Sequence, residues 1–103
     1  ERIARVRSRR DLMRHVCAPE ELLHPMTNLR TARMWAGKEA VAKALGTGFW
    51  QEGVEWRDVR FDAHWSVSCH GPAARLLGPS ALAVEFRQDG DRIVAMALRT
   101  QPV

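Results

Sequence analysis

The spacing of apolar residues along the chain changes once, from a helical period to strict alternation. Residues 2–17 contain no glycine or proline, and apolar side chains recur there at spacings that fit one helical face. These side chains are Ile3, Val6, Met13 and Val16. The pattern predicts a helix over residues 2–17.

Two further helical segments follow. Residues 18–23 carry a proline at a first-turn position and two carboxylates behind it, which predicts a short helix ending before the next proline. Thr27 or Asn28 then suits the cap of a long helix that runs to Leu45. Gly46 supplies the left-handed residue that commonly ends such a helix.

Alternating apolar and polar residues predict strands in the rest of the chain. The expected elements are strands over 54–61, 65–69, 82–86 and 92–99, with a short helix over 73–77. Asp58 is a candidate bulge, and the Asp89-Gly90 pair is typical of a tight hairpin turn. The last strand is apolar on both faces, so we expect it to be central. Helices followed by antiparallel strands indicate an α+β domain.

Length and composition limit the architecture to one domain. The chain has 103 residues, 46% of them hydrophobic, which is enough for one core. Its apolar runs, such as Val94–Leu98, are far shorter than the roughly 20 residues of a membrane-spanning helix. It begins at Glu1 without the features of a signal peptide, which suggests that an upstream segment was removed. Cys17 and Cys69 stand far apart without a C-x-x-C pair, so we expect no zinc ribbon or disulfide framework and a cytoplasmic protein.

Positive charge is concentrated at the start of the chain. The formal charge is +4, and six arginines fall within the first fourteen residues. Arg2, Arg5 and Arg9 lie at helical spacing and form one cationic stripe, which favours an acidic partner. No aromatic residue interleaves these arginines, which disfavours nucleic acid. The alternative is a solvated face in a chain that has 14 arginines and 2 lysines.

One constellation in the long helix carries recognisable chemistry. Residues 35–48 read WAGKEAVAKALGTG. Glu39 and Lys43 are one turn apart on one face, and Lys38 neighbours that face, so we expect a carboxylate and two ammonium groups to converge. A carboxylate can hold Mg²⁺ and lysines can hold phosphates, which suits the attack on a pyrophosphate. The alternative is an ordinary exposed Glu39–Lys43 pair, stabilising the helix by about 0.2–0.5 kcal/mol.

This segment resembles the signature of the 4'-phosphopantetheinyl transferase superfamily, W/F-x-x-K-E-A-x-x-K followed by a glycine turn. More weakly, residues 18–22 look like the family's T-x-x-E-L segment, residues 54–59 like its next strand and residues 89–91 like its final hairpin. The resemblance implies an α+β fold in which the motif helix packs on an antiparallel sheet. It also implies transfer of the 4'-phosphopantetheine arm of coenzyme A to a serine of an acyl or peptidyl carrier protein, in fatty acid, polyketide or nonribosomal peptide synthesis.

The same resemblance assigns roles to individual residues. Glu39 matches the family's Mg²⁺ ligand and candidate base, while Lys38 and Lys43 match its coenzyme A phosphate ligands, with Lys43 also part of the catalytic set. The arginine stripe fits the acidic helix that carrier proteins present. The implied partners are therefore coenzyme A, Mg²⁺ and a carrier protein.

The chain departs from the family pattern at two places. Family members carry an aspartate in a G-x-D strand just before the segment that matches Glu1, and small trimeric synthases carry a histidine where this chain has Gln88. Larger enzymes built from two halves lack that histidine in their second half. Residues 1–103 therefore read as one domain that lacks its first strand or belongs to a longer chain, and that needs a homotrimer or a partner half. The alternative function is a catalytically inactive module that binds carrier proteins.

Overall fold

The computed structural model of the chain describes residues 9–46 and 53–102. Its elements, in order, are α1 (Arg9–Val16), η2 (Pro19–Leu23), α2 (Asn28–Leu45), η4 (Trp56–Asp58), β1 (Val59–Phe61), β2 (Val67–Cys69), α3 (Gly71–Leu77), β3 (Ala81–Asp89) and β4 (Arg92–Thr100). Among these residues, no helix is both long and apolar enough to cross a membrane.

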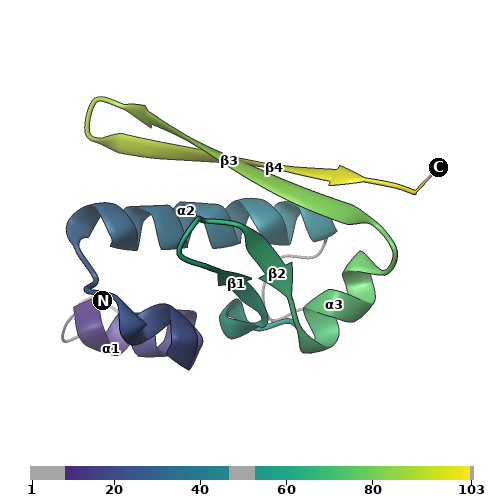
Figure 1. Cartoon of the computed structure of the whole chain (residues 1–103), viewed down its shortest axis with the longest axis horizontal. Helices are drawn as coiled ribbons and strands as arrows, with labels where there is room; N and C mark the ends of the chain where they lie inside the picture. Colours follow the sequence, from purple (N-terminus) through teal and green to yellow (C-terminus); the bar gives the residue numbers. More distant parts are fainter. Residues whose placement is uncertain (1–8, 47–52, 103) are drawn as a thin grey trace, which may run out of the picture.

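Helix α2 is the middle layer of the molecule (Figure 1). The β3–β4 hairpin packs on one side of it, and α1, the β1–β2 pair and α3 lie on the other side. Both pairs of strands are antiparallel. The predicted α+β fold, with the long motif helix packed on antiparallel strands, is confirmed.

The limits of α2 follow from local capping chemistry. The Thr27 hydroxyl oxygen accepts a hydrogen bond of 3.1 Å from the Arg30 amide, which satisfies one free donor of the first turn. At the other end Gly46 has a φ of 87°, and its amide donates to the Lys43 carbonyl over 3.0 Å. Both predicted ends of the helix are confirmed.

The hairpin also forms where the sequence predicts it, but β4 is not central. Its register runs from Ala81 opposite Thr100 to Asp89 opposite Arg92, with the turn at Gly90. Within the described ranges β4 pairs only with β3. One face of β4 packs on α2 and the other is exposed. The prediction of a central strand was therefore wrong, although both faces carry apolar residues. The exposed apolar residues of the outer face are Val94, Met96 and Leu98.

The segment between residues 53 and 70 is less regular than predicted. Trp56 lies in the turn η4, and only residues 59–61 form the first strand. Asp58 is not a bulge: it ends that turn, and its carboxylate accepts a hydrogen bond of 2.9 Å from the Glu55 amide. Trp65 has a φ of 63°, a left-handed conformation that keeps it out of β2.

The other predicted helices are present, but they begin or end at different residues than predicted. The segment after Ala18 is a 3-10 helix, and α3 begins at Gly71, two residues before the predicted start. Of the helix predicted over 2–17, the structure describes Arg9–Val16 as α1, and residues 1–8 lie outside the described part.

The core lies between α2 and its neighbours on both sides. Its buried members include Met13, Val16, Met34, Val41, Leu45, Val54, Val59, Phe61 and Ala73. Gly37 of α2 allows the closest approach, since a β-carbon there would lie 2.7 Å from Phe61 Cζ and 2.9 Å from Phe86 Cζ. The two rings meet edge to face, with centroids 5.7 Å apart, directly over this glycine.

Gly37→Ala tests this packing. The methyl group would have to displace both rings, and such overpacking costs about 1–3 kcal/mol, which exceeds the helix propensity gained with alanine, about 1 kcal/mol. We expect the free energy of unfolding in urea to fall. The pair Leu29→Ala and Leu29→Gly, at an exposed position of the same helix, reports the propensity difference alone. A Gly37→Ala protein more stable than the parent would contradict the close approach.

Candidate functional site

Lys38 lies in the interior of the protein. Its side chain is fully buried, and its ammonium group donates to four oxygens that come from four different segments. They are Val16 O at 2.8 Å, Glu21 Oε1 at 2.7 Å, Trp56 O at 3.0 Å and Val59 O at 2.5 Å. We call these five residues the Lys38 cluster. An ammonium has three protons, so all of them are satisfied within the protein.

Glu21 is the acidic member of this cluster and is equally buried. Besides Lys38, its carboxylate accepts hydrogen bonds of 2.8 Å each from the amides of Ala18 and Phe61. Burial lowers the pKa of Lys38, and the Glu21 charge opposes that shift. A buried ion pair in which both charged groups also make further hydrogen bonds is the arrangement in which such a pair is tolerated inside a protein.

The predicted convergence of both lysines on Glu39 is therefore wrong for Lys38. Neighbouring residues of a helix point about 100° apart, since each turn takes 3.6 residues. Here that rotation places Lys38 in the core and leaves Glu39 exposed. As the structure stands, the Lys38 ammonium cannot reach a phosphate outside.

Glu39 and Lys43 do share an exposed face, and it borders a groove between α2 and β4. This α2–β4 groove has a volume of about 580 Å³. Its lining comes from one side of α2 and from six consecutive β4 residues, Arg92–Ala97; the α2 residues are Ala36, Glu39, Ala40, Lys43 and Ala44. Among the described residues the ion pairs are Lys38–Glu21 and Arg60–Glu20. Glu39 and Lys43 therefore do not form the simple ion pair that the alternative interpretation of the motif predicts.

A second hollow of about 470 Å³ continues the groove toward the start of α2. It shares Ala36, Glu39 and Ile93 with the first, so Glu39 stands where the two meet. Trp35 forms part of its wall, is 36% exposed, and stacks on Trp56 with ring centroids 4.8 Å apart. The sequence marked Trp35 only as a member of the motif.

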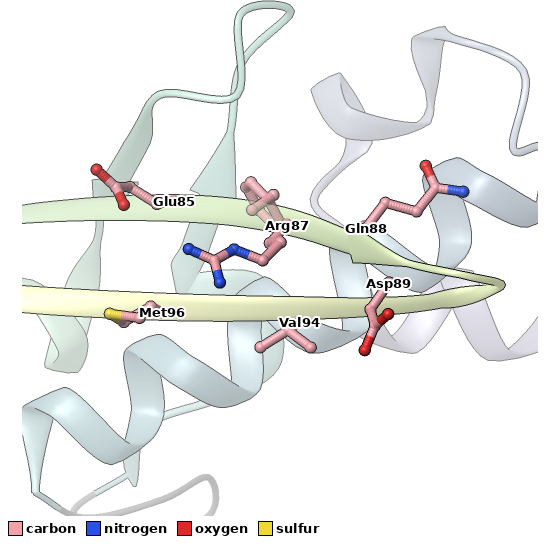
Figure 2. Close-up of a pocket in the computed structure, with 7 residues that line it drawn as sticks. Glu85, Arg87, Gln88, Asp89, Val94 and Met96 are labelled. Atoms are coloured by element: carbon pink, nitrogen blue, oxygen red, sulfur yellow. The ribbon is translucent and has the colours of Figure 1, made fainter.

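Gln88, for which the resemblance predicts a histidine, lies outside the α2–β4 groove. Figure 2 shows it near the tip of the hairpin, with Glu85 and Arg87 further along β3 and Met96 on β4. These residues line a hollow of about 740 Å³ that includes the exposed face of the hairpin. The Gln88 amide donates to the Gly90 carbonyl over 3.1 Å. Gln88 does not line the α2–β4 groove.

Glu39 fits the role of one metal ligand, but not of a complete site. The described residues contain no group of three or more histidine, cysteine or acidic side chains that could hold a metal ion. Mg²⁺ commonly takes one or two protein carboxylates and fills its shell with water and substrate phosphates. An exposed carboxylate that forms no ion pair with another described residue, at the point where two hollows meet, suits that pattern.

The remaining candidates contribute little chemistry. Burial raises the pKa of the Cys17 thiol to about 11 and also raises that of Cys69, so neither is a thiolate at neutral pH. Both are free cysteines. Of the arginine stripe, Arg2 and Arg5 lie outside the described residues, as does the side chain of Arg9.

Comparisons with known proteins agree with the motif. The family model of the 4'-phosphopantetheinyl transferase superfamily matches residues 1–97. A protein named holo-[acyl-carrier-protein] synthase from Halorhodospira halophila is 36% identical, over 93% of this chain and 90% of its own length. A protein of the same name from Solidesulfovibrio magneticus is 38% identical, over 79% of this chain and 71% of its own. No solved structure matches the chain significantly.

The different positions of the two lysines predict different effects of the same substitution. Lys38→Met leaves Glu21 charged and buried without its cation, and breaking such a pair costs about 3–5 kcal/mol. Lys43→Met, on the exposed face of the same helix, should change stability by about 0.5 kcal/mol or less. Urea denaturation of both variants measures the difference. Equal effects would show that the Lys38 cluster does not stabilise the fold.

Proposed function

The chain belongs to the 4'-phosphopantetheinyl transferase superfamily, and from that premise we propose that it transfers the 4'-phosphopantetheine arm of coenzyme A to a serine of an acyl carrier protein. The family match covers almost the whole chain. The observation that carries the proposal is that Glu39 and Lys43, both within the motif, are exposed together on one groove and make no ion pair within the described ranges.

In the proposed reaction the serine oxygen attacks the phosphorus that bears the arm. A new P–O bond forms to serine, the pyrophosphate bond breaks, and 3',5'-ADP leaves with the electron pair. In this proposal Glu39 accepts the serine proton or holds Mg²⁺, which would neutralise charge on the pyrophosphate. Lys43, one turn along the same face, binds a phosphate of coenzyme A.

Lys38 has a structural role in this proposal. The Lys38 cluster fixes the rotation of α2 about its axis, and that rotation turns Glu39 and Lys43 toward the groove. The two motif lysines thus have different roles. One supports the helix, and the other meets the substrate.

The proposed partners are a carrier protein, bound through Arg2, Arg5 and Arg9, and a second copy of the chain or a partner half. The exposed apolar face of β4 supports association, since monomeric proteins seldom leave such a face uncovered. A homotrimer is the assembly expected from the family, and the cytoplasm is the expected compartment.

An inactive carrier-binding module is the second candidate. Two observations favour it: Gln88 replaces the family histidine, and Glu39 is the single carboxylate lining the α2–β4 groove in the part of the chain that the structure describes. Such a module would bind a carrier protein without adding mass to it.

Glu39→Gln tests the catalytic proposal directly. The parent chain, incubated with coenzyme A, Mg²⁺ and apo carrier protein, should add the arm to the carrier, measured by mass spectrometry. We expect Glu39→Gln to lower the rate by about 100-fold or more, since it removes charge from the reacting centre. Glu55→Gln, at an exposed carboxylate that does not line the groove, is the matched control. A carrier that binds the parent chain but gains no mass would support the inactive module.

Self-association is tested on the outer face of β4. Leu98 is 65% exposed there and does not line the α2–β4 groove, so a charge at this position leaves the monomer fold and the groove intact but opposes burial against another chain. We expect Leu98→Glu to shift the sedimentation coefficient toward that of a monomer and to lower transfer activity with it. Thr100→Glu, at the exposed end of the same strand, serves as the control. A parent chain that sediments as a monomer and still transfers the arm would contradict the shared site.

A further inference from the structure

Two arginines of α2 lie against one aromatic ring. Arg30 and Arg33 are three residues apart and are therefore neighbours on one side of the helix. Their guanidinium carbons lie 5.2 and 5.5 Å from the centroid of the Trp65 ring, and that of Arg33 lies 5.9 Å from the centroid of the Phe86 ring. These four side chains, which we call the arginine–tryptophan cluster, come from α2, the connection between β1 and β2, and β3.

The positive charge of this cluster is not neutralised within the described part of the chain. Neither arginine forms an ion pair with a described residue. Asp62 belongs to the same connection as Trp65, but its carboxylate accepts hydrogen bonds of 2.9 Å each from the amides of His64 and Ser66. Two like charges at this spacing on a helix repel one another. The cluster thus holds two neighbouring cations that lack a counter-ion among the described residues.

Both arginines also lack hydrogen-bond acceptors. The Nε atom of each is shielded from solvent and has no hydrogen-bond partner within residues 9–46 and 53–102, and leaving a buried N–H without an acceptor is costly. One Nη atom of Arg30 donates to the Glu21 carbonyl over 3.1 Å. An aromatic ring stabilises the charge of a guanidinium group but accepts none of the hydrogen bonds along its edge. The ring contacts therefore explain where the two groups lie, and not why their donors are left unpaired.

The backbone holds Trp65 against the arginines in an unfavourable conformation. Its φ of 63° lies in the left-handed region, which a bulky residue seldom adopts. The Trp65 amide donates to the Asp62 carbonyl over 3.0 Å, which closes the turn around this conformation. Backbone strain of this kind is concentrated at functional sites, where the surrounding structure maintains it.

We propose that the arginine–tryptophan cluster binds a small phosphate anion, either inorganic phosphate or a phosphate monoester. A phosphate monoester carries about 1.5 to 2 negative charges at neutral pH and three acceptor oxygens, so one anion can neutralise and pair with both arginines. A single carboxylate has one charge and two oxygens, which match one guanidinium group only. The site is separate from the α2–β4 groove, because neither arginine lines the two hollows there.

Calorimetric titration with inorganic phosphate, at constant ionic strength, tests the site. The parent chain should bind phosphate saturably at millimolar concentration. We expect Arg33→Gln, which removes one charge and its donors, to weaken binding by about 10-fold or more. Arg33→Lys keeps the charge but not the paired N–H groups, so its affinity should lie between those two. Arg57→Gln makes the same change of charge at an exposed residue outside the cluster and should leave the affinity unchanged. Glycerol 3-phosphate, titrated in the same way, shows whether the site also takes monoesters.

Lys43→Met separates this site from the α2–β4 groove. Phosphate binding that is lost in Lys43→Met and kept in Arg33→Gln would overturn the proposal, as would a parent chain without saturable binding. An acidic peptide that binds more tightly than phosphate and depends equally on Arg33 would also overturn it, in favour of a protein partner. Arg33→Lys retains a cation beside the rings and keeps the test decisive if Arg33→Gln does not fold. Transfer activity is not the readout, so the proposed function stands or fails independently.

Discussion

The buried ion pair between Lys38 and Glu21 is the interaction on which the rest of the structure depends. It joins the end of α1, the segment η2, the turn η4 and strand β1 to the middle of α2 through a single ammonium group. Moving both charges out of water is costly, and the cost is met only while all partner oxygens keep their places. The cluster therefore favours one packing of these segments over others in which an ammonium or a carboxylate would be buried alone.

This constraint also decides what the rest of the motif does. With Lys38 directed inward and Gly37 under the rings of Phe61 and Phe86, α2 has little freedom to rotate. Glu39 and Lys43 then face the groove because of their spacing from Lys38. The motif therefore combines two kinds of residue: Gly37 and Lys38 stabilise the fold, and Glu39 and Lys43 are available for the chemistry. A count of its charged residues overestimates the charge available to a substrate.

The hairpin shows the opposite situation, a surface that the described residues leave uncovered. Its inner face is held by α2, while Val94, Met96 and Leu98 stay exposed and the far edge of β4 has no partner strand within residues 9–46 and 53–102. An apolar face and an open edge are both sites at which another molecule can gain contacts. They are the surfaces that the proposed association with a second chain would cover.

The sequence alone determined the parts of this protein that depend on nearby residues. Thr27 and Gly46 set the ends of α2, Asp89-Gly90 set the hairpin turn, and Glu39 with Lys43 marked the exposed chemical face, because caps, turns and one-turn spacings act over a few residues. The tertiary structure alone decided the burial of Lys38, whose partners lie 17 to 22 residues away along the chain. It also decided that β4 is an edge, since apolar residues on two faces do not reveal whether a second layer covers both. Contacts between segments far apart in sequence depend on how the layers pack, and no local pattern of residues records that.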